Sequence, residues 1–181
     1  MAELRHRLAT QADVPALTRL MARAIAELQR GFLDAAQIAA SASVMGMDTQ
    51  LIDDGTYFVI ETGGEIAGCG GWSRRATLFG GDHSAGRDAA LLDPARDPAR
   101  VRAMYTAPEF ARRGVGRLIL KLCEDAAARE GFGRVELAAT LAGEPLYRAC
   151  GYEVIEPFEA DTPECVRVPL KRMGKAIVMP S

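Results

Sequence analysis

The sequence lacks a long apolar run. No stretch approaches the roughly 20 apolar residues that a helix needs to span a bilayer. The first residues, MAELRHRLATQADVP, lack the apolar core of a signal peptide. We therefore expect a cytoplasmic protein with no membrane partner.

Cysteine is scarce and scattered. The four cysteines are Cys69, Cys123, Cys150 and Cys165. None belongs to a Cys-x-x-Cys pair, and none has a histidine at ligand spacing, which argues against a zinc site or a disulfide framework. We expect four small buried thiols, kept reduced, and no metal cofactor.

An excess of basic charge is also missing. The 22 Lys and Arg residues face 24 Asp and Glu residues, which leaves a formal net charge of −2 at pH 7. This balance argues against a nucleic-acid partner bound through its phosphates. With 181 residues, 49% of them hydrophobic and 25% charged, the chain is expected to fold as one globular domain.

Hydrophobic periodicity predicts strands and helices in the N-terminal half. Residues 4–8 alternate like a short strand, and Thr10 to Asp13 resemble the start of a helix that Gly31 ends. The next predicted elements are a helix over 33–44, a turn at 53–55, and strands at 56–62 and 65–73 joined by a Gly-Gly turn. The glycines at 68, 70 and 71 predict a bulge or a close approach by another backbone.

The C-terminal half begins with an expected exposed loop over 78–100, and a loop of about twenty residues is usually functional or disordered. The elements expected after it are a strand over 100–106, a helix over 114–130 closed by Gly131, a strand over 134–140, a short helix over 144–150, and strands near 152–156 and 165–170. This order predicts an α/β fold with helices on the faces of a sheet.

A Gly-x-Gly turn leads into the helix predicted over 114–130. Gly114 and Gly116 remove side chains that would keep an anion away from the first helical amides, which carry the positive end of the helix dipole. Arg112, Arg113 and Arg117 add charge and directed donors. The stretch therefore predicts a pyrophosphate cradle. An ordinary tight turn remains an alternative, but the spacing fits neither a P-loop nor a Rossmann fingerprint.

This turn resembles the acetyl-coenzyme A motif of the GCN5-related N-acetyltransferases, Gln/Arg-x-x-Gly-x-Gly/Ala. Gly114 and Gly116 match its glycines, while Ala111 stands where the family usually has Gln or Arg, with Arg112 beside it. The preceding Thr106-x-Pro108 and the later Leu-Tyr-x-x-x-Gly-Tyr over 146–152 also resemble family patterns. The Asn often found after the fifth strand is absent, and Thr140-Leu-Ala-Gly143 lies there instead.

The resemblance implies a single α/β domain over 1–175, followed by a C-terminal tail over 176–181. Its sheet would be mixed, mostly antiparallel and splayed between strands 4 and 5, with helices on both faces. The pantetheine arm of acetyl-CoA would pair with the backbone of Met104, Tyr105 and Thr106. The pyrophosphate would be held by amides of Arg112, Arg113, Gly114, Val115, Gly116 and Arg117. Tyr147 would contact the cofactor and act as the general acid for the leaving thiolate.

Several further side chains are open to more than one interpretation. The general base is not identified, and the residues eligible by type are Glu61, Glu65, Asp82, His83, Glu109 and Glu136. Trp72 either lines an acceptor pocket or packs the sheet, and packing is favoured for Tyr57. Arg74 and Arg75 either attract an acidic acceptor or solubilise a strand end.

The resemblance implies an N-acetyltransferase that moves an acetyl group from acetyl-CoA directly to a primary amine of a small molecule or peptide. One alternative is a non-catalytic acyl-CoA-binding module that acts as a sensor or partner subunit. Another is a nucleotide phosphate binder that uses the same turn. A homodimer formed through the last strands is also expected by resemblance.

Overall fold

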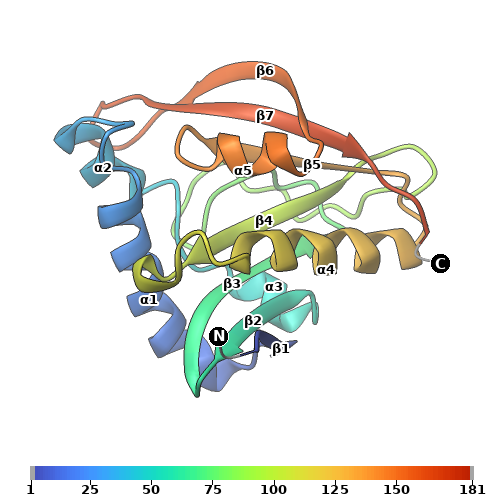
Figure 1. The fold of residues 1–181 in the computed structure, drawn as a ribbon. Coiled ribbons are helices and arrows are strands. Elements are labelled where there is room, and N and C mark those ends of the chain that lie inside the picture. Colours follow the sequence, from blue (N-terminus) through green and yellow to red (C-terminus); the bar gives the residue numbers. More distant parts are fainter. Residues whose placement is uncertain (1–2, 180–181) are drawn as a thin grey trace.

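The structure, a computed structural model, describes residues 3–179 and contains a seven-stranded sheet in the order β1-β2-β3-β4-β5-β7-β6 (Figure 1). The strands are β1 Arg5–Leu8, β2 Tyr57–Thr62, β3 Glu65–Ser73, β4 Ala99–Thr106, β5 Arg134–Thr140, β6 Glu153–Ala160 and β7 Val168–Ala176. Neighbouring strands are antiparallel except β4 and β5, which are parallel. The predicted mixed, mostly antiparallel α/β sheet is confirmed.

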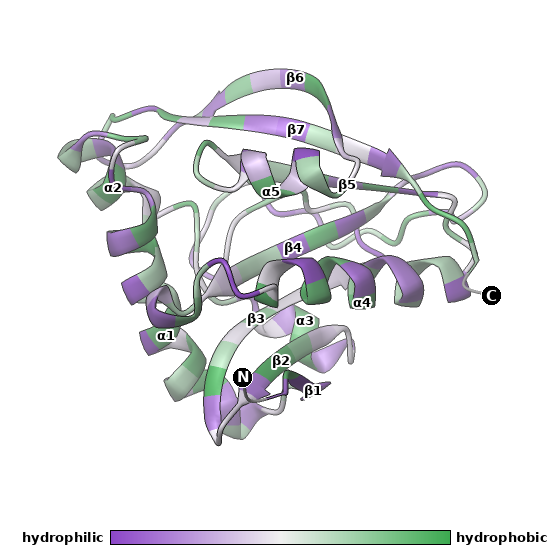
Figure 2. Ribbon diagram, viewed as in Figure 1, coloured by the Kyte–Doolittle hydropathy of each residue, from purple (hydrophilic) through white to green (hydrophobic). Residues whose placement is uncertain are grey.

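Helices cover both faces of this sheet. They are α1 Val14–Leu28, α2 Ala35–Ser41, α3 Thr49–Asp53, α4 Val115–Arg129 and α5 Glu144–Ala149, with short 3-10 turns η1 Gln11–Asp13 and η2 Pro108–Phe110. Neighbouring residues of β2 point to opposite sides: Val59 packs in the core that contains the buried side of α1, and Ile60 packs in the core beneath α4. Both helices carry alternating purple and green bands in Figure 2, as expected for helices with one hydrophobic side.

The 3-10 turn η1, which leads into α1, is fixed by the residues that the sequence suggested for the helix start. The backbone N–H of Thr10 donates to the Asp13 carboxylate at 2.7 Å, which forms part of a capping box. Arg7 on β1 forms an ion pair with the same carboxylate at 2.8 Å and holds the pKa of Asp13 near 2. This contact ties the first strand to the first helix.

The glycines of β3 allow α4 to lie close to the sheet. A Cβ atom at Gly70 would lie 2.6 Å from Cγ2 of Ile119 on α4, too close for a real contact. The register between β3 and β4 also shifts between Cys69 and Gly71. Both consequences predicted for these glycines are therefore present, although the close approach is by a helix side chain as well as by strand backbone.

The sheet splays open between β4 and β5. These strands pair only at Ala99 with Val135 and at Arg100 with Glu136, and no strand pairing joins them beyond Arg100 within the described residues. β5 instead pairs along its whole length with β7. The predicted splay is confirmed, and it leaves one edge of β4 open.

Several predicted boundaries were wrong. The expected helix over 33–44 is the shorter α2, and α3 was not predicted at all. The late strands are longer than expected: β6 continues through Pro157, which an edge strand tolerates because one side of its backbone is unpaired. The last strand begins at Val168, and Cys165 lies in a turn with a φ of +57°.

The C-terminal boundary also lies later than expected. Ala176 is the last residue of β7, and Ile177 is buried with its N–H donating to Gly133 O at 3.0 Å. The folded unit therefore extends past residue 175, while residues 180–181 of the expected tail lie outside the described part of the chain. No helix within residues 3–179 is both long and apolar enough to cross a membrane.

The long segment after β3 is held in place by specific contacts. The N–H of Thr77 donates to Asp88 O at 2.9 Å, and the N–H of Leu92 donates to Arg74 O at 2.8 Å. The Arg87 guanidinium reaches back to Asp48 at 2.6 Å. These contacts hold the segment against the rest of the fold.

Candidate active site

A cavity of about 100 Å³ lies where β4 and β5 separate. Its wall is mainly apolar, and six of the side chains that form it are Val44, Met45, Leu78, Phe79, Leu137 and Leu170. Hydroxyl groups come from Tyr105, Thr140 and Tyr147, and a guanidinium comes from Arg102. The connection after α2, the loop after β3, and three strands therefore meet around one small space.

The β4 edge at this cavity has an unusual backbone. Ala103 has a φ of +50°, which a residue with a side chain rarely adopts. The Tyr57 hydroxyl donates to the carbonyl of Ala103 at 2.7 Å and holds this conformation in place. Beyond Arg100, the backbone groups that turn away from β3 have no neighbouring strand to pair with. Such groups need an extended polar partner.

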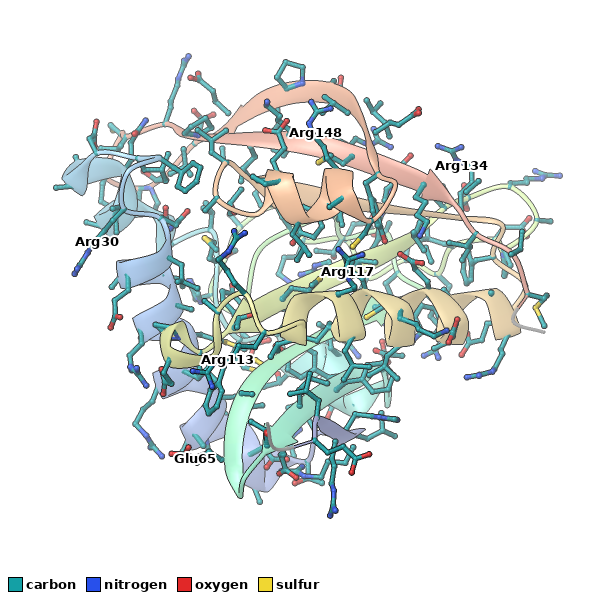
Figure 3. All side chains as sticks on the ribbon, in the orientation of Figure 1. Arg30, Glu65, Arg113, Arg117, Arg134 and Arg148 are labelled. Atoms are coloured by element: carbon teal, nitrogen blue, oxygen red, sulfur yellow. The ribbon has the colours of Figure 1, made fainter. Side chains whose placement is uncertain are left out.

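The turn before α4 presents free amides and unpaired positive charge. Gly114 caps the helix with a φ of +87°, and a Cβ atom there would meet nothing within 4 Å. Arg112, Arg113 and Arg117 are exposed, and none of them forms an ion pair or a side-chain hydrogen bond with another described residue. Figure 3 shows Arg113 and Arg117 at the N-terminal end of α4. This arrangement suits an anion.

Gly116 has a packing role that the sequence did not suggest. A Cβ atom at this position would lie 2.6 Å from Cδ2 of Leu146 on α5. The glycine therefore lets α5 pack against the first turn of α4. Of the two glycines, only Gly114 faces open space.

The sequence over residues 18–152 matches the acetyltransferase (GNAT) family model, and this range includes β4, the turn and α5. The protein belongs to this family. No curated protein is similar enough in sequence to count as a match.

Solved structures of GNAT enzymes share the fold. A GCN5-related N-acetyltransferase from Rhodopseudomonas palustris has 15% sequence identity and a TM-score of 0.69, covering 98% of this chain and 96% of its own. A phosphinothricin acetyltransferase from Sinorhizobium meliloti, solved with acetyl-CoA, has 17% identity and a TM-score of 0.64, covering 97% and 89%. The ribosomal-protein-S18-alanine N-acetyltransferase of Escherichia coli has 16% identity and a TM-score of 0.59, covering 99% and 97%.

Tyr147 of this GNAT protein lies on α5 and lines the cavity. Its hydroxyl is 3.9 Å from the Met104 sulfur on β4, and its ring makes an edge contact with Tyr152 at 5.9 Å between centroids. Burial raises the pKa of Tyr147 to about 12. The hydroxyl is therefore protonated at neutral pH and can donate a hydrogen bond.

Five carboxylates and one histidine were considered as the general base, and none of these six side chains lines the cavity. Four of the carboxylates are held by arginines: Glu61 by Arg7, Asp82 by Arg87, Glu109 by Arg23, and Glu136 by Arg100 and Arg172. The His83 ring lies 2.7 Å from Ala42 O. Glu65 is exposed at the lower end of β3 in Figure 3.

The structure also decides between the two interpretations given to other side chains. Trp72 is buried and packs edge-on against Phe132, so it supports the sheet and does not line the cavity. Tyr57 is buried in the other core, as favoured from the sequence. Arg74 forms an ion pair with Glu130 at 2.6 Å and Arg75 with Asp54 at 2.7 Å, so both are used within the fold.

The prediction of buried thiols is confirmed for two of the four cysteines. Cys69 and Cys123 are buried, which raises the pKa of the Cys69 thiol to about 12. Cys150 is half-buried and Cys165 is exposed, so the expectation of four buried thiols was wrong. Within residues 3–179, no group of three or more His, Cys, Asp or Glu side chains is placed to hold a metal ion.

Sequence reasoning missed the buried charge cluster behind the cavity. Asp48 is 1% exposed and forms ion pairs with Arg102 at 3.0 Å and with Arg87 at 2.6 Å. Arg102 lines the cavity, and 54 residues separate it from Asp48 in the sequence. The only local sign of this cluster in the sequence was Arg102, an arginine within the predicted strand over 100–106, which the structure buries.

Proposed function

We propose that this GNAT protein is an N-acetyltransferase that moves an acetyl group from acetyl-CoA to a primary amine. The observation that carries the proposal is the open edge of β4, which runs from the cavity toward the unpaired arginines before α4. An elongated molecule with amides along its length and a diphosphate at one end would satisfy both features. A related fold solved with acetyl-CoA supports this assignment.

The residues present fit this cofactor. Backbone groups of Met104, Tyr105 and Thr106 would pair with its amide-containing arm, as an added strand would. Amides over 112–117, with the side chains of Arg112, Arg113 and Arg117, would hold the diphosphate. The open space at Gly114 leaves these amides accessible. Acetyl-CoA itself would supply the activated acyl group.

The chemistry is a direct transfer. The amine nitrogen attacks the thioester carbonyl carbon, a C–N bond forms, and the C–S bond breaks to release a thiolate. A backbone N–H on the open edge of β4 would stabilise the developing oxyanion. The proposed role of Tyr147 is to donate to the thiolate. With its pKa near 12, it stabilises the leaving sulfur mainly as a hydrogen-bond donor, because a free thiol has a pKa of about 8.5.

Deprotonation of the amine does not require a side chain on the cavity wall. The amine must be neutral when it attacks, and an alkylamine with a pKa of about 10 has a small neutral fraction in bulk water at neutral pH. The rate should therefore rise with pH as the neutral fraction of the amine increases.

The test combines binding and turnover. Calorimetric titration should show that CoA and acetyl-CoA bind, and both should raise the melting temperature, while ATP and NAD should not. Release of free CoA thiol should then depend on an added amine. Binding without turnover across a broad amine panel would instead support the non-catalytic module. Stabilisation by nucleotides alone would support the nucleotide-binding alternative.

A further inference from the structure

The cavity beside β4 carries one positive charge and no negative charge. Among the described residues that line it, Arg102 is the one that is charged at neutral pH, and no Asp, Glu or His side chain is present. The rest of the wall is apolar or bears neutral hydroxyl groups. A second ammonium group on an acceptor would therefore enter without a counter-ion, which is costly in an apolar space.

Arg102 is deeply buried for a cation. The residue is 4% exposed, and its guanidinium donates to Asp48, to Gly80 O, and to Thr77 O at 3.3 Å. Arg102 does not have Asp48 to itself, because the same carboxylate also binds Arg87. One buried carboxylate is thus shared by two guanidinium groups.

Arg87 also pairs with Asp82, so two carboxylates and two guanidinium groups meet around Arg102. Burial lowers the pKa of Arg102 from its ordinary value, and the charge of Arg87 acts in the same direction, against the attraction of Asp48. A guanidinium has five N–H donors, and three hydrogen bonds leave donors for another acceptor. A carboxylate entering the cavity would accept from these remaining donors.

We propose that the acceptor of this enzyme is an amine that also carries a carboxylate, which Arg102 binds, and an apolar body that packs against Leu78, Phe79 and Leu170. This inference rests on the proposed acetyltransferase function and names its class of acceptor. Arginine suits the role because its planar fork matches a carboxylate.

The spacing along β4 is compatible with such an acceptor. Arg102 and Met104 lie on either side of Ala103 on β4, and both line the cavity. Met104 is next to the Tyr147 hydroxyl, where the thioester is proposed to lie. A carboxylate held by Arg102 would therefore place an amine a few bonds away near the reacting carbonyl.

The wild-type protein provides a direct test. Initial rates of CoA release should be measured with apolar amino acids and their primary amides, such as leucine and leucinamide, with β- and γ-amino acids of similar size, and with 1,5-diaminopentane. We expect kcat/KM to be at least tenfold higher for the best acid than for its amide, and lowest for the diamine. An amide or the diamine that matches or exceeds every acid would overturn the proposal.

Two variants locate the effect. Arg102→Gln should remove the preference for acid over amide while acetyl-CoA still binds. Arg100→Gln changes a neighbouring arginine on the same strand that pairs with Glu136 and does not line the cavity, so it should keep the preference. If Arg102→Gln retains the wild-type ratio, Arg102 does not select the acceptor.

The acceptor proposal can fail without the proposed function failing. Acetylation of amides or diamines in preference to acids leaves acetyl transfer intact and removes only the role of Arg102. Absence of CoA binding by the wild-type protein contradicts the proposed function itself. If Arg102→Gln does not fold, the acid-to-amide ratio of the wild-type protein still decides the question.

Discussion

Two groups of arginines lie near the open edge of β4, and their different surroundings give them different roles. Arg112, Arg113 and Arg117 are exposed beside α4, with no ion pair among the described residues. Arg87 and Arg102 lie behind the cavity and share the buried Asp48 carboxylate. The first group has no carboxylate partner and is available for a ligand's phosphates, whereas the second is held by buried ion pairs and leaves only the remaining donors of Arg102 for a ligand in the cavity.

Pairing with a carboxylate distinguishes the two roles better than charge does. An unpaired exposed arginine costs the fold little, because water solvates it. A buried arginine requires its carboxylate, since removing one partner leaves an uncompensated charge. Substitutions in the two groups should therefore affect different quantities.

The largest effect is expected for Asp48→Ala. The change leaves Arg87 and Arg102 without their shared carboxylate and removes the hydrogen bond from Gln50 N–H that caps α3. We expect a loss of about 3–5 kcal/mol in the free energy of unfolding, measured by urea denaturation. Glu109→Ala, which breaks an exposed ion pair with Arg23, is the matched control and should leave the midpoint almost unchanged. Equal losses of unfolding free energy in the two variants would mean that the buried ion pairs stabilise the fold no more than the exposed one.

Tyr147→Phe tests the catalytic end of the cavity. Removing the hydroxyl should lower kcat by about 100-fold, while the dissociation constant for CoA changes little, because the ring still packs on Tyr152. Stopped assays of CoA release and calorimetry measure the two quantities. An unchanged kcat would exclude Tyr147 from the proposed acid role.

The pH profile of the wild-type protein follows from the same hydroxyl. The protonated form is the active one, and a pKa near 12 keeps Tyr147 protonated throughout the neutral and mildly alkaline range. The rate should therefore rise as the amine loses its proton and show no fall between about pH 7 and 10. A fall in that range that is absent in Tyr147→Phe would show that the tyrosine ionises there.

Gly116→Ala separates packing from anion binding at the turn. The new methyl group would press on Leu146, so we expect a destabilisation of about 1–3 kcal/mol in thermal or urea unfolding. Leu146→Ala in the same chain should restore part of that loss, because it makes room for the methyl group. If the double variant loses as much unfolding free energy as the two single variants added together, the new methyl group does not clash with Leu146.

Arg117→Glu is expected to have the smallest effect on the fold and a selective effect on the ligand. Affinity for CoA should fall about tenfold, with stability nearly unchanged, because the side chain has no partner among residues 3–179 to lose. Arg129→Glu makes the same charge change at the other end of α4 and is the control. Equal losses of affinity in both variants would indicate a general charge effect in place of a local site.

Local features of the sequence predicted the fold class and the turn before α4. The capping residues Thr10 and Asp13, the glycine at 114 and the strand into Thr106 act over a few residues, and each occupies its expected place. The packing role of Gly116 was not predicted, because Leu146 reaches it from another helix. Local sequence does not encode such a neighbour.

Long-range contacts explain most of what the sequence did not predict. The Asp48–Arg102 pair forms only when the segment before α3 folds against β4. The five-residue α3 depends on Asp48 as its cap and is too short to give a periodic signal. The continuation of β6 through Pro157 depends on its position at the edge of the sheet.

A crystal structure of the protein with bound CoA would show whether the turn before α4 and the open edge of β4 form the cofactor site. We expect the diphosphate to contact the amides over 112–117 and the pantetheine arm to run along Met104, Tyr105 and Thr106 with its sulfur near Tyr147. A diphosphate bound elsewhere, with the edge of β4 left unpaired, would contradict this expectation.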